Sequence, residues 1–570
     1  MANTKRYWTG LDDLHQTEAF QTLQGQEFPQ HETVDEMLGN EELTSSTTGR
    51  RDFLKFMGFS LAAATLAACE TPVVKSIPYV NKPADVTPGV ANHYASTYYN
   101  GHDYVNVMVK TREGRPIFIK SNKDTGVGHA NVRVNASVMG LYDSARLQGP
   151  HLSGAGSTWQ ALDAEVGKAM AGSGRKVVLT NTILSPSLQR AIDAFCGAHG
   201  AEHVQVDAVS HSALRTAAKQ HTGSDSFPAF DFAKAQTVVT VGADFLGTWG
   251  DAVYYASEWI KTRRPENGEM SSLHAFETVM SMTGTNADAR TMVKPSEQNK
   301  VLAALHSAIV GGAAVTGLSD QVSAAVSAAA SDLKKAGSAG LVVAGANDVD
   351  AQLVAAAINT ALGADGTTVK YNGEGLFAGD DAAFAQLVKD MNAGRVSALV
   401  MHGTNPAYHA ADKEAFRTGL GKVKFSVSTS GMADETAARC TAMAPDHHWL
   451  ENWMDLRIGG TRVDLAQPTI QPLFDTRAAG ESFMAWAGQP KAWYDVIRTT
   501  HNAGYTSDAM YSDGQWNSSL HDGFYMTGND MPASAPALGI DVSASVRRLA
   551  SSAGGNVELA LYQKQAIAAG

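Results

Sequence analysis

The sequence predicts a multidomain α/β protein with parallel sheets. Short, continuous runs of β-branched and apolar residues alternate with amphipathic stretches between residues 156 and 480. This pattern is typical of parallel sheets covered by helices on both faces. The chain has 570 residues, more than one compact core holds. We therefore expect a leader at 1–68, a β-rich domain at 69–150, α/β domains at 151–310 and 311–480, and a partial region at 481–570.

The β-rich domain is predicted from a hairpin. Residues 104–109 alternate between apolar and polar side chains, 111–114 form a turn with glycine at its end, and 116–119 return. The α/β strands are expected at 176–179, 204–206, 237–241, 341–344, 398–401 and 425–428, and the helices at 159–170, 185–199, 348–362 and 381–392.

The stretch 311–340 is rich in Ala, Ser and Gly, but Val322, Val326, Ala329 and Leu333 recur at near-helical spacing. A helix of small residues is therefore expected there rather than a linker. Beyond Gly480 the pattern weakens, and we expect a partial domain that lacks its neighbours.

The N-terminal segment of the chain has the features of an export signal. Arg50 and Arg51 precede an apolar run at 56–68, and the small residues 66–68 end at Cys69. A twin arginine before such a run predicts Tat-type export of a folded protein, and the small triplet before Cys69 matches a lipobox. We expect an acylated Cys69 and a lipid-anchored protein at the periplasmic face of the bacterial inner membrane. The alternative is a buried cytosolic helix preceded by two solvated arginines.

Charge and cysteine content narrow the function further. The net charge is −12, which argues against nucleic acid or an anionic leaflet as a partner. The cysteines are Cys69, Cys196 and Cys440. Three thiols are too few for four-cysteine ligation of an iron–sulfur cluster or a structural zinc within this chain. Cys196 shares a predicted helix face with Ile192 and Phe195, as a small buried hydrophobe would.

Three turns that follow predicted strands are candidates for cofactor binding: 242–245, 345–348 and 403–406. Backbone N–H groups converge at such turns. Each turn alone is best explained as a structural cap, but three along one sheet edge would form a crevice for a long phosphorylated cofactor. No GxGxxG or P-loop sequence is present.

Two sets of metal-ligand-type side chains also occur. Asp446, His447 or His448, and Glu451 could bind a divalent metal, although surface or interface polar residues fit their spacing better. His274 and Glu277 lie three residues apart on an expected helix, which is weak evidence for a shared metal. No nucleophile with a local base signature is found, so no catalytic residue is assigned.

Several segments resemble molybdopterin oxidoreductases of the DMSO-reductase type. Residues 230–235 and 238–246 resemble the middle of these proteins, and 399–408 resemble their second cofactor-domain turn. Further matches are 114–116, 141–147, 434–436, 444–446, 450–451 and 467–472, so that the resemblance covers about residues 75–500. It implies a DMSO-reductase-like fold, with Gly242, Asp244, Gly403 and Asn405 in a vestigial cofactor pocket.

The departures from that family suggest a different role. Catalytic members carry a cysteine-rich cluster motif before the hairpin, whereas residues 70–103 contain no cysteine, and neither Cys196 nor Cys440 fits the place of the molybdenum ligand. Residues Tyr7 and Trp8, the late twin arginine and the turn at 247–249 look like the large periplasmic subunit of alternative complex III, a quinol-oxidising respiratory complex. The related quinone reductase complex of sulfate reducers is similar.

This resemblance implies a scaffold subunit without its own redox centre, and molybdopterin is not expected. Its implied partners are an iron–sulfur ferredoxin-like subunit or domain, multihaem cytochrome c subunits and a quinol-binding membrane subunit, with iron–sulfur clusters and haem c held by those partners. Relatives would continue past residue 570, so we expect a separately encoded front half or a truncated product. The alternatives are an active molybdopterin enzyme ligated through Asp244 or a histidine, and a solute-binding lipoprotein.

Overall fold

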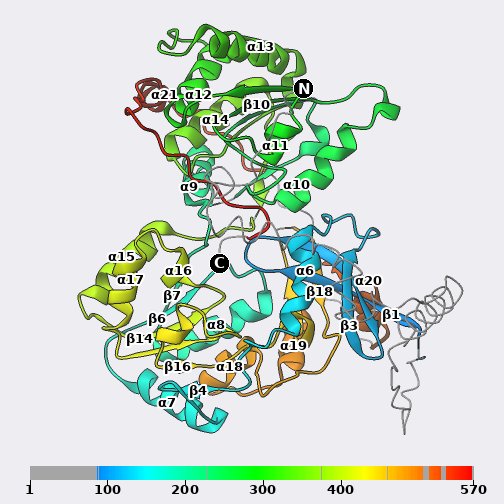
Figure 1. Ribbon diagram of the computed structural model, residues 1–570, viewed down its shortest axis with the longest axis vertical. Helices are drawn as coiled ribbons and strands as arrows, with labels where there is room; N and C mark the ends of the chain where they lie inside the picture. The colour runs from blue at the N-terminus through cyan, green and yellow to red at the C-terminus, as the bar shows by residue number, and fades with distance from the viewer. Residues whose placement is uncertain are drawn as a thin grey trace, which may run out of the picture. The chain divides into compact units, whose positions relative to one another are not determined.

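The computed structural model describes residue 87 and residues 89–225, 227–373, 375–458, 460–504, 513–527 and 534–567. These residues belong to one compact unit, Ala84–Gly570 (Figure 1). Arg50, Arg51 and Cys69 lie outside the described residues, so the export signal and the acylation site stay predictions. Within the described ranges, no helix combines the length and the apolar character needed to cross a bilayer.

The predicted hairpin is present in an antiparallel sheet of order β1-β2-β3, formed by β1 (Ala91–Tyr99), β2 (Tyr104–Arg112) and β3 (Arg115–Ser121). Glu113 and Gly114 form its two-residue turn, with φ of 53° and 75°. Positive φ at both positions suits the twist of the flanking strands. Helix α6 (Val132–Leu141) packs against β3.

A seven-stranded sheet forms the largest layer. Its order is β5-β4-β16-β15-β14-β6-β7, with the strands β4 (His151–Leu152), β5 (Ala155–Gly156), β6 (Arg175–Thr180), β7 (Glu202–Gln205), β14 (Val396–His402), β15 (Phe425–Ser428) and β16 (Ala442–Met443). The strands from β16 to β7 in this order are parallel to their neighbours. Its helices are α7 (Trp159–Ala171), α8 (Pro186–His199), α15 (Asp381–Asn392), α16 (Pro406–His409), α17 (Lys413–Leu420) and α18 (Ala479–Trp486).

A second, four-stranded sheet is entirely parallel and has the order β11-β10-β9-β12. Its strands are β9 (Thr237–Val241), β10 (Ser272–Glu277), β11 (Ala289–Met292) and β12 (Gly340–Ala344). The helices of this part are α9 (Ser212–Thr222), α10 (Ala252–Trp259), α11 (Met282–Thr285), α12 (Pro295–Ile309), α13 (Asp320–Ala336) and α14 (Val349–Leu362). Helix α13 confirms the helix of small residues, since it buries Val322, Val326, Ala329 and Leu333.

The remaining elements are short. Strands β8 (Phe227–Phe230) and β13 (Val369–Gly373) pair antiparallel. Single-turn 3₁₀ helices are η1 (Phe232–Lys234), η2 (Ile260–Thr262), η3 (Pro265–Asn267), η4 (Gly337–Ala339), η5 (Ala437–Arg439) and η6 (Trp449–Glu451).

Strand pairing departs from the consecutive grouping that the sequence predicts. Strand β6 pairs with β14, which lies roughly two hundred residues later in the chain, while β12 pairs with β9 of the earlier group. The four-stranded sheet is therefore built from chain that leaves the seven-stranded sheet after β7 and returns to it at β14. The domain limits proposed from the sequence stay predictions, but the strands of each sheet do not follow them.

The described residues beyond residue 480 pack on the rest of the chain, while the expectation of a partial domain there stays a prediction. Helices α19 (Trp493–Gly504), α20 (Asp513–Asp522) and α21 (Ser543–Ala550) follow α18. Strand β19 (Phe524–Met526) completes a sheet with β17 (Met454–Leu456) and β18 (Arg462–Ala466). Helix α21 packs on α12 and α14. Buried aromatic side chains of this region pack against strands that are distant in sequence.

Asp455 ties three of these elements together. Its side chain is fully buried; it accepts hydrogen bonds from the hydroxyl groups of Ser185 and Ser187, at 2.5 and 2.6 Å, and lies 2.8 Å from His501 Nε2. The serines belong to the start of α8, and His501 belongs to α19. A buried carboxylate is tolerated when several donors satisfy its oxygens.

Replacement of Asp455 by alanine is expected to lower the free energy of unfolding by about 3 kcal/mol, because buried hydroxyl and imidazole groups lose their acceptor. Thermal and urea unfolding followed by circular dichroism measure this change. Asp513→Ala is the matched control: its carboxylate pairs with Arg498, but is 86% exposed, so the loss should stay below about 0.5 kcal/mol. Equal losses in both variants would contradict the role of Asp455.

Candidate cofactor pocket and buried polar network

The seven-stranded sheet contains a topological switch point. Strands β6 and β14 are neighbours, but β6 leads to β7 on one side and β14 leads to β15 on the other. In open α/β sheets such a point opens a crevice at the carboxyl ends of the two strands, where ligands bind. Asn181 follows β6, and Gly403 follows β14, so both residues stand at this crevice.

The crevice is closely filled by protein atoms. A Cβ atom on Gly403, which has φ of +63°, would lie 2.6 Å from Asn181 Oδ1, and one on Gly101 would lie 2.8 Å from Asn181 Nδ2. The pocket that remains has a volume of about 60 Å³. Pockets that hold cofactor-sized ligands measure roughly 300–1,000 Å³. A molybdopterin-type cofactor therefore does not fit this pocket in the described conformation.

The electrostatics of the pocket do not favour a phosphorylated ligand either. Burial lowers the pKa of His409 to about 4, and it also lowers the pKa of His102, so both imidazoles are neutral near pH 7. Neither Lys nor Arg is found among the described residues that line the pocket. Nε2 of the buried His102 has no hydrogen-bond partner in the described structure. The pocket can accommodate water-sized groups, but it offers no positive charge to a phosphate.

Asn405 holds the turn after β14 in place. Its Nδ2 donates to Glu435 Oε2 at 2.8 Å, and its Oδ1 accepts from the hydroxyl of Thr436 at 2.7 Å. Asn405 and Gly403 both line the 60 Å³ pocket, so the structure brings these two predicted residues together. Both ends of the Asn405 side-chain amide are nevertheless hydrogen-bonded to the neighbouring loop.

Gly242 and Asp244 lie on the other sheet, after β9. A Cβ atom on Gly345 would lie 2.0 Å from the carbonyl oxygen of Gly242, because the turns after β9 and β12 are in contact. Asp244 Oδ1 accepts from the N–H and the hydroxyl of Thr283, each at 2.9 Å. The three turns do not lie along one sheet edge, as a single crevice for a long cofactor would require: two belong to the four-stranded sheet and one to the seven-stranded sheet.

Neither described cysteine is placed as a metal ligand at these turns. Cys196 lies in α8, packed against the core, and burial raises its pKa to about 11. Cys440 donates to the carbonyl oxygen of Thr436 at 3.3 Å, and burial raises its pKa to about 12. Both thiols are free and protonated at neutral pH, whereas metal ligation requires the thiolate.

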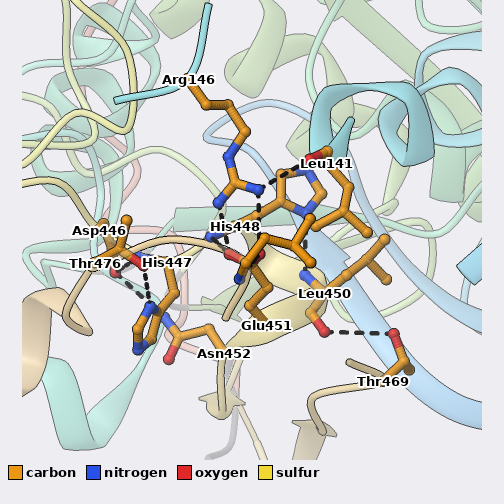
Figure 2. A network of polar contacts seen from close by, with 11 residues as sticks. Leu141, Arg146, Asp446, His447, His448, Leu450, Glu451, Asn452, Thr469 and Thr476 are labelled. Atoms are coloured by element: carbon orange, nitrogen blue, oxygen red, sulfur yellow. Dashed lines mark hydrogen bonds and ion pairs between the residues drawn. The ribbon is translucent and has the colours of Figure 1, made fainter. Parts of the chain in front are cut away.

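Residues 445–451 form an internal polar network, whereas the sequence favours surface or interface polar residues there (Figure 2). Arg146 Nη2 and Nη1 donate to the two carboxylate oxygens of Glu451 at 2.6 and 3.1 Å. The two side chains are 4% and 0% exposed. Glu451 also accepts from the backbone N–H groups of Leu473 and His448. Burial by itself raises the pKa of Glu451, but these hydrogen bonds and the Arg146 charge lower it on balance.

The other members of this set also have protein partners (Figure 2). Asp446 Oδ1 accepts from the N–H groups of His447 and Ala479, and burial raises the pKa of Asp446 to about 7. His447 Nδ1 lies 2.6 Å from the hydroxyl of Thr476. Among the described residues no group of three or more His, Cys, Asp or Glu side chains is arranged to hold a metal ion.

His274 and Glu277 do not share a helix, as expected from the sequence, because both lie in strand β10. Three residues apart in a strand, they point to opposite faces. His274 Nε2 lies 3.1 Å from Asp332, and Glu277 pairs with Arg290. The metal hypothesis for this pair loses its geometric basis.

Sequence reasoning missed Asn181, His102 and Arg146. Asn181 directly follows a predicted strand, so the rule that selected Gly403 would also have selected it. Arg146 and Glu451 both lie in segments that carry the family resemblance, 141–147 and 450–451, but they are 305 residues apart. No local pattern in the sequence signals their pairing.

Two comparisons with known proteins bear on the chain, while no protein-family model matches it. The chain is 25% identical over 508 residues to the molybdopterin-binding-like subunit of menaquinone reductase from Nitratidesulfovibrio vulgaris, covering 77% of this chain and 72% of that protein. The structure is similar to that of acetylene hydratase from Pelobacter acetylenicus, with a TM-score of 0.55, 12% identity, and coverage of 76% and 74% of the two chains. This likeness shows the fold. At that level it confirms the multidomain α/β architecture of the DMSO-reductase type, with parallel sheets, that the sequence predicts.

Arg146→Met is expected to lower the free energy of unfolding by about 3–5 kcal/mol, because it leaves the buried Glu451 carboxylate without its counter-charge. Urea unfolding at pH 7 measures the loss. Arg548→Met removes an ion pair with Asp350 in which Arg548 is 61% exposed, and should cost far less, because solvent screens an exposed pair. A loss for Arg146→Met no larger than that of this control would contradict the assignment.

Asp446 predicts a pH dependence of stability. A carboxyl group whose pKa is raised in the folded state stabilises the fold when it is protonated. For Asp446 this contribution is complete below the unfolded pKa, near 4, and is lost as the pH rises toward the folded pKa of about 7. Asp446→Asn keeps an oxygen that accepts from His447 and Ala479 but does not ionise. Relative to the wild type, the variant should therefore gain about 3 kcal/mol on going from pH 4.5 to pH 8. Melting temperatures across this range measure the gain, and parallel curves for the two proteins would refute it.

Proposed function

We propose that this chain is a cofactor-free scaffold subunit of a membrane quinol oxidoreductase complex of the alternative complex III or menaquinone reductase kind. It is anchored by acylated Cys69 at the periplasmic face of the inner membrane after export in the folded state. Its partners are an iron–sulfur ferredoxin-like subunit or domain, multihaem cytochrome c subunits and a quinol-binding membrane subunit. The electron carriers belong to those partners, and the chain holds them in position.

The observation that carries this proposal is the closure of both strand-end crevices. The turns after β9 and β12 are packed on each other, and the crevice between β6 and β14 retains about 60 Å³. Side chains that would face a cofactor, such as Asp244 and Asn405, are hydrogen-bonded to their own chain. A pterin site needs polar side chains that remain free to bind the ligand. Polar groups of a ligand that find no hydrogen-bond partner in the site weaken its binding.

The similarity to the menaquinone reductase subunit supports the placement in a quinone-linked complex. That relative is itself described as molybdopterin-binding-like, and the match extends over 508 residues. The match runs through both parallel sheets rather than a single motif, so it supports a shared architecture and, by our proposal, a shared position in a complex.

Metal and haem analysis of the protein purified from native membranes tests the proposal. We expect iron and haem c to co-purify with partner subunits, and molybdenum to be far below one atom per chain. After the partners are dissociated with mild denaturant, this chain should be colourless and free of iron. Stoichiometric molybdenum would instead support an active molybdopterin enzyme. A lone, colourless monomer from native membranes would refute the complex.

A further inference from the structure

The outer face of the sheet β1-β2-β3 gathers positive charge. Register places Lys110 opposite Phe118 and Arg112 opposite Arg115, and Lys120 follows Phe118 by two residues on β3. Directly opposed residues, and residues two apart in a strand, point to the same side of a sheet. These four cations and the Phe118 ring therefore share one face. The other face carries Val109 and Ile119, which are buried in the core.

These cations have no ion-pair partner among the residues that the structure describes. Arg112, Arg115 and Lys120 are exposed and Lys110 is half-buried. Segment 110–124 holds five Lys and Arg residues against two carboxylates, Glu113 and Asp124, in a chain of net charge −12. The local excess of positive charge thus opposes the charge of the whole protein.

An exposed apolar pair accompanies the cations. Ile117 and Phe118 are each 47% exposed, and Ile117 sits at the irregularity where the register of β2 and β3 shifts. Strand β3 is the edge of its sheet. A single exposed apolar residue is ordinary on a protein surface, but an aromatic ring surrounded by four unpaired cations is typical of surfaces that enter the interface of a membrane.

One carboxylate, Glu113, lies in the β2–β3 turn beside Arg112 and Arg115, and further acidic residues lie at the far side of the face. A groove of about 650 Å³ adjoins it at β1, lined among others by His93, Asp124 and Asp522. Part of the same sheet face is covered there, since Ala95 is buried and packs closely on Gly523. The open part of the face is the part nearest the β2–β3 turn, which carries the four cations.

We propose that this face, defined by Lys110, Arg112, Arg115, Phe118 and Lys120, binds an anionic phospholipid surface. The cations complement lipid phosphates, and Phe118 with Ile117 reaches the apolar boundary below the headgroups. One supporting argument rests on the proposed function: Ala91 lies 22 residues after Cys69, so an acylated cysteine keeps this sheet within about 75 Å of the bilayer. The charge and the exposed ring carry the proposal without that anchor.

Vesicle flotation of the full chain carrying Cys69→Ser, which removes acylation, tests this surface by comparison between vesicles and between variants, because the apolar run at 56–68 is common to all of them. Vesicles of phosphatidylcholine are compared with vesicles that also contain phosphatidylglycerol. We expect binding only to the anionic vesicles, and its loss at about 0.5 M salt because screening shortens the reach of the charges. The variant Lys110→Gln, Arg112→Gln, Arg115→Gln, Lys120→Gln should bind at least a hundredfold more weakly, since each cation near such a surface contributes about fivefold.

The matched control removes four exposed cations elsewhere: Lys334→Gln, Lys413→Gln, Arg264→Gln and Arg547→Gln. It should bind anionic vesicles within about threefold of the Cys69→Ser chain if the effect is local. Phe118→Ser, a single change on an edge strand, should weaken binding while preserving the melting temperature, which guards against misfolding of the multiple variant.

Three results would overturn the proposal. They are equal binding to neutral and anionic vesicles, equal weakening in the patch variant and the control, and full vesicle binding by the patch variant together with loss of partner subunits on purification. The last result would assign the face to a protein. None of these results depends on metal content, so a failure here leaves the test of the scaffold function intact.

Discussion

Glu451 is an ionised carboxylate with no exposed side-chain surface, and its pairing with Arg146 is the constraint on which the surrounding architecture depends. Removing such a charge from water costs several kcal/mol unless its oxygens are fully satisfied. The oxygens of Glu451 accept hydrogen bonds from three separate segments of the chain. The donors are Arg146 after α6, His448 in the loop after β16, and Leu473 near α18. Arg146 also donates to the carbonyl oxygen of Leu141, the last residue of α6. Consequently the N-terminal sheet with α6 and the seven-stranded sheet are fixed to one another at a buried point.

The strand-end turns show the same preference for internal pairing. Asn181 occupies the space between Gly101 and Gly403, and Gln298 comes within 2.5 Å of the position a Cβ on Gly242 would take. Glycine at these turns permits close approach of the chain to itself. In a dinucleotide- or pterin-binding fold, glycine at such turns permits close approach of a ligand instead. Glycine at a strand-end turn can therefore indicate either a tightly packed turn or a ligand site. Only the neighbouring side chains distinguish the two.

This ambiguity explains which features could be predicted from sequence. Elements with local signals, such as α8 with Ser185 and Pro186 at its start, or the buried strand β9, agree with the predicted positions within a few residues. The sheet order could not be predicted, because parallel pairing of β6 with β14 joins segments more than two hundred residues apart. Strand β10 was assigned as a helix because a six-residue segment has too few turns to establish a period. The spacing of residues 446–451 favours surface or interface polar residues, because Arg146, the partner of Glu451, is distant in sequence.

The internal pairing has a consequence for how such a chain acts on other molecules. A protein whose strand-end polar groups are hydrogen-bonded to its own chain can still bind other molecules through its surface. Such a surface can hold a partner in a fixed position only if it is firmly attached to the core. The three-stranded sheet is attached through β1 on β18 and through α6, whose exit is held by the buried Arg146–Glu451 pair. Buried ion pairs add little net stability, but they penalise strongly any displacement that separates the partners. The sheet that carries the basic face is therefore held rigidly on the α/β body, which is what the proposed scaffold function requires.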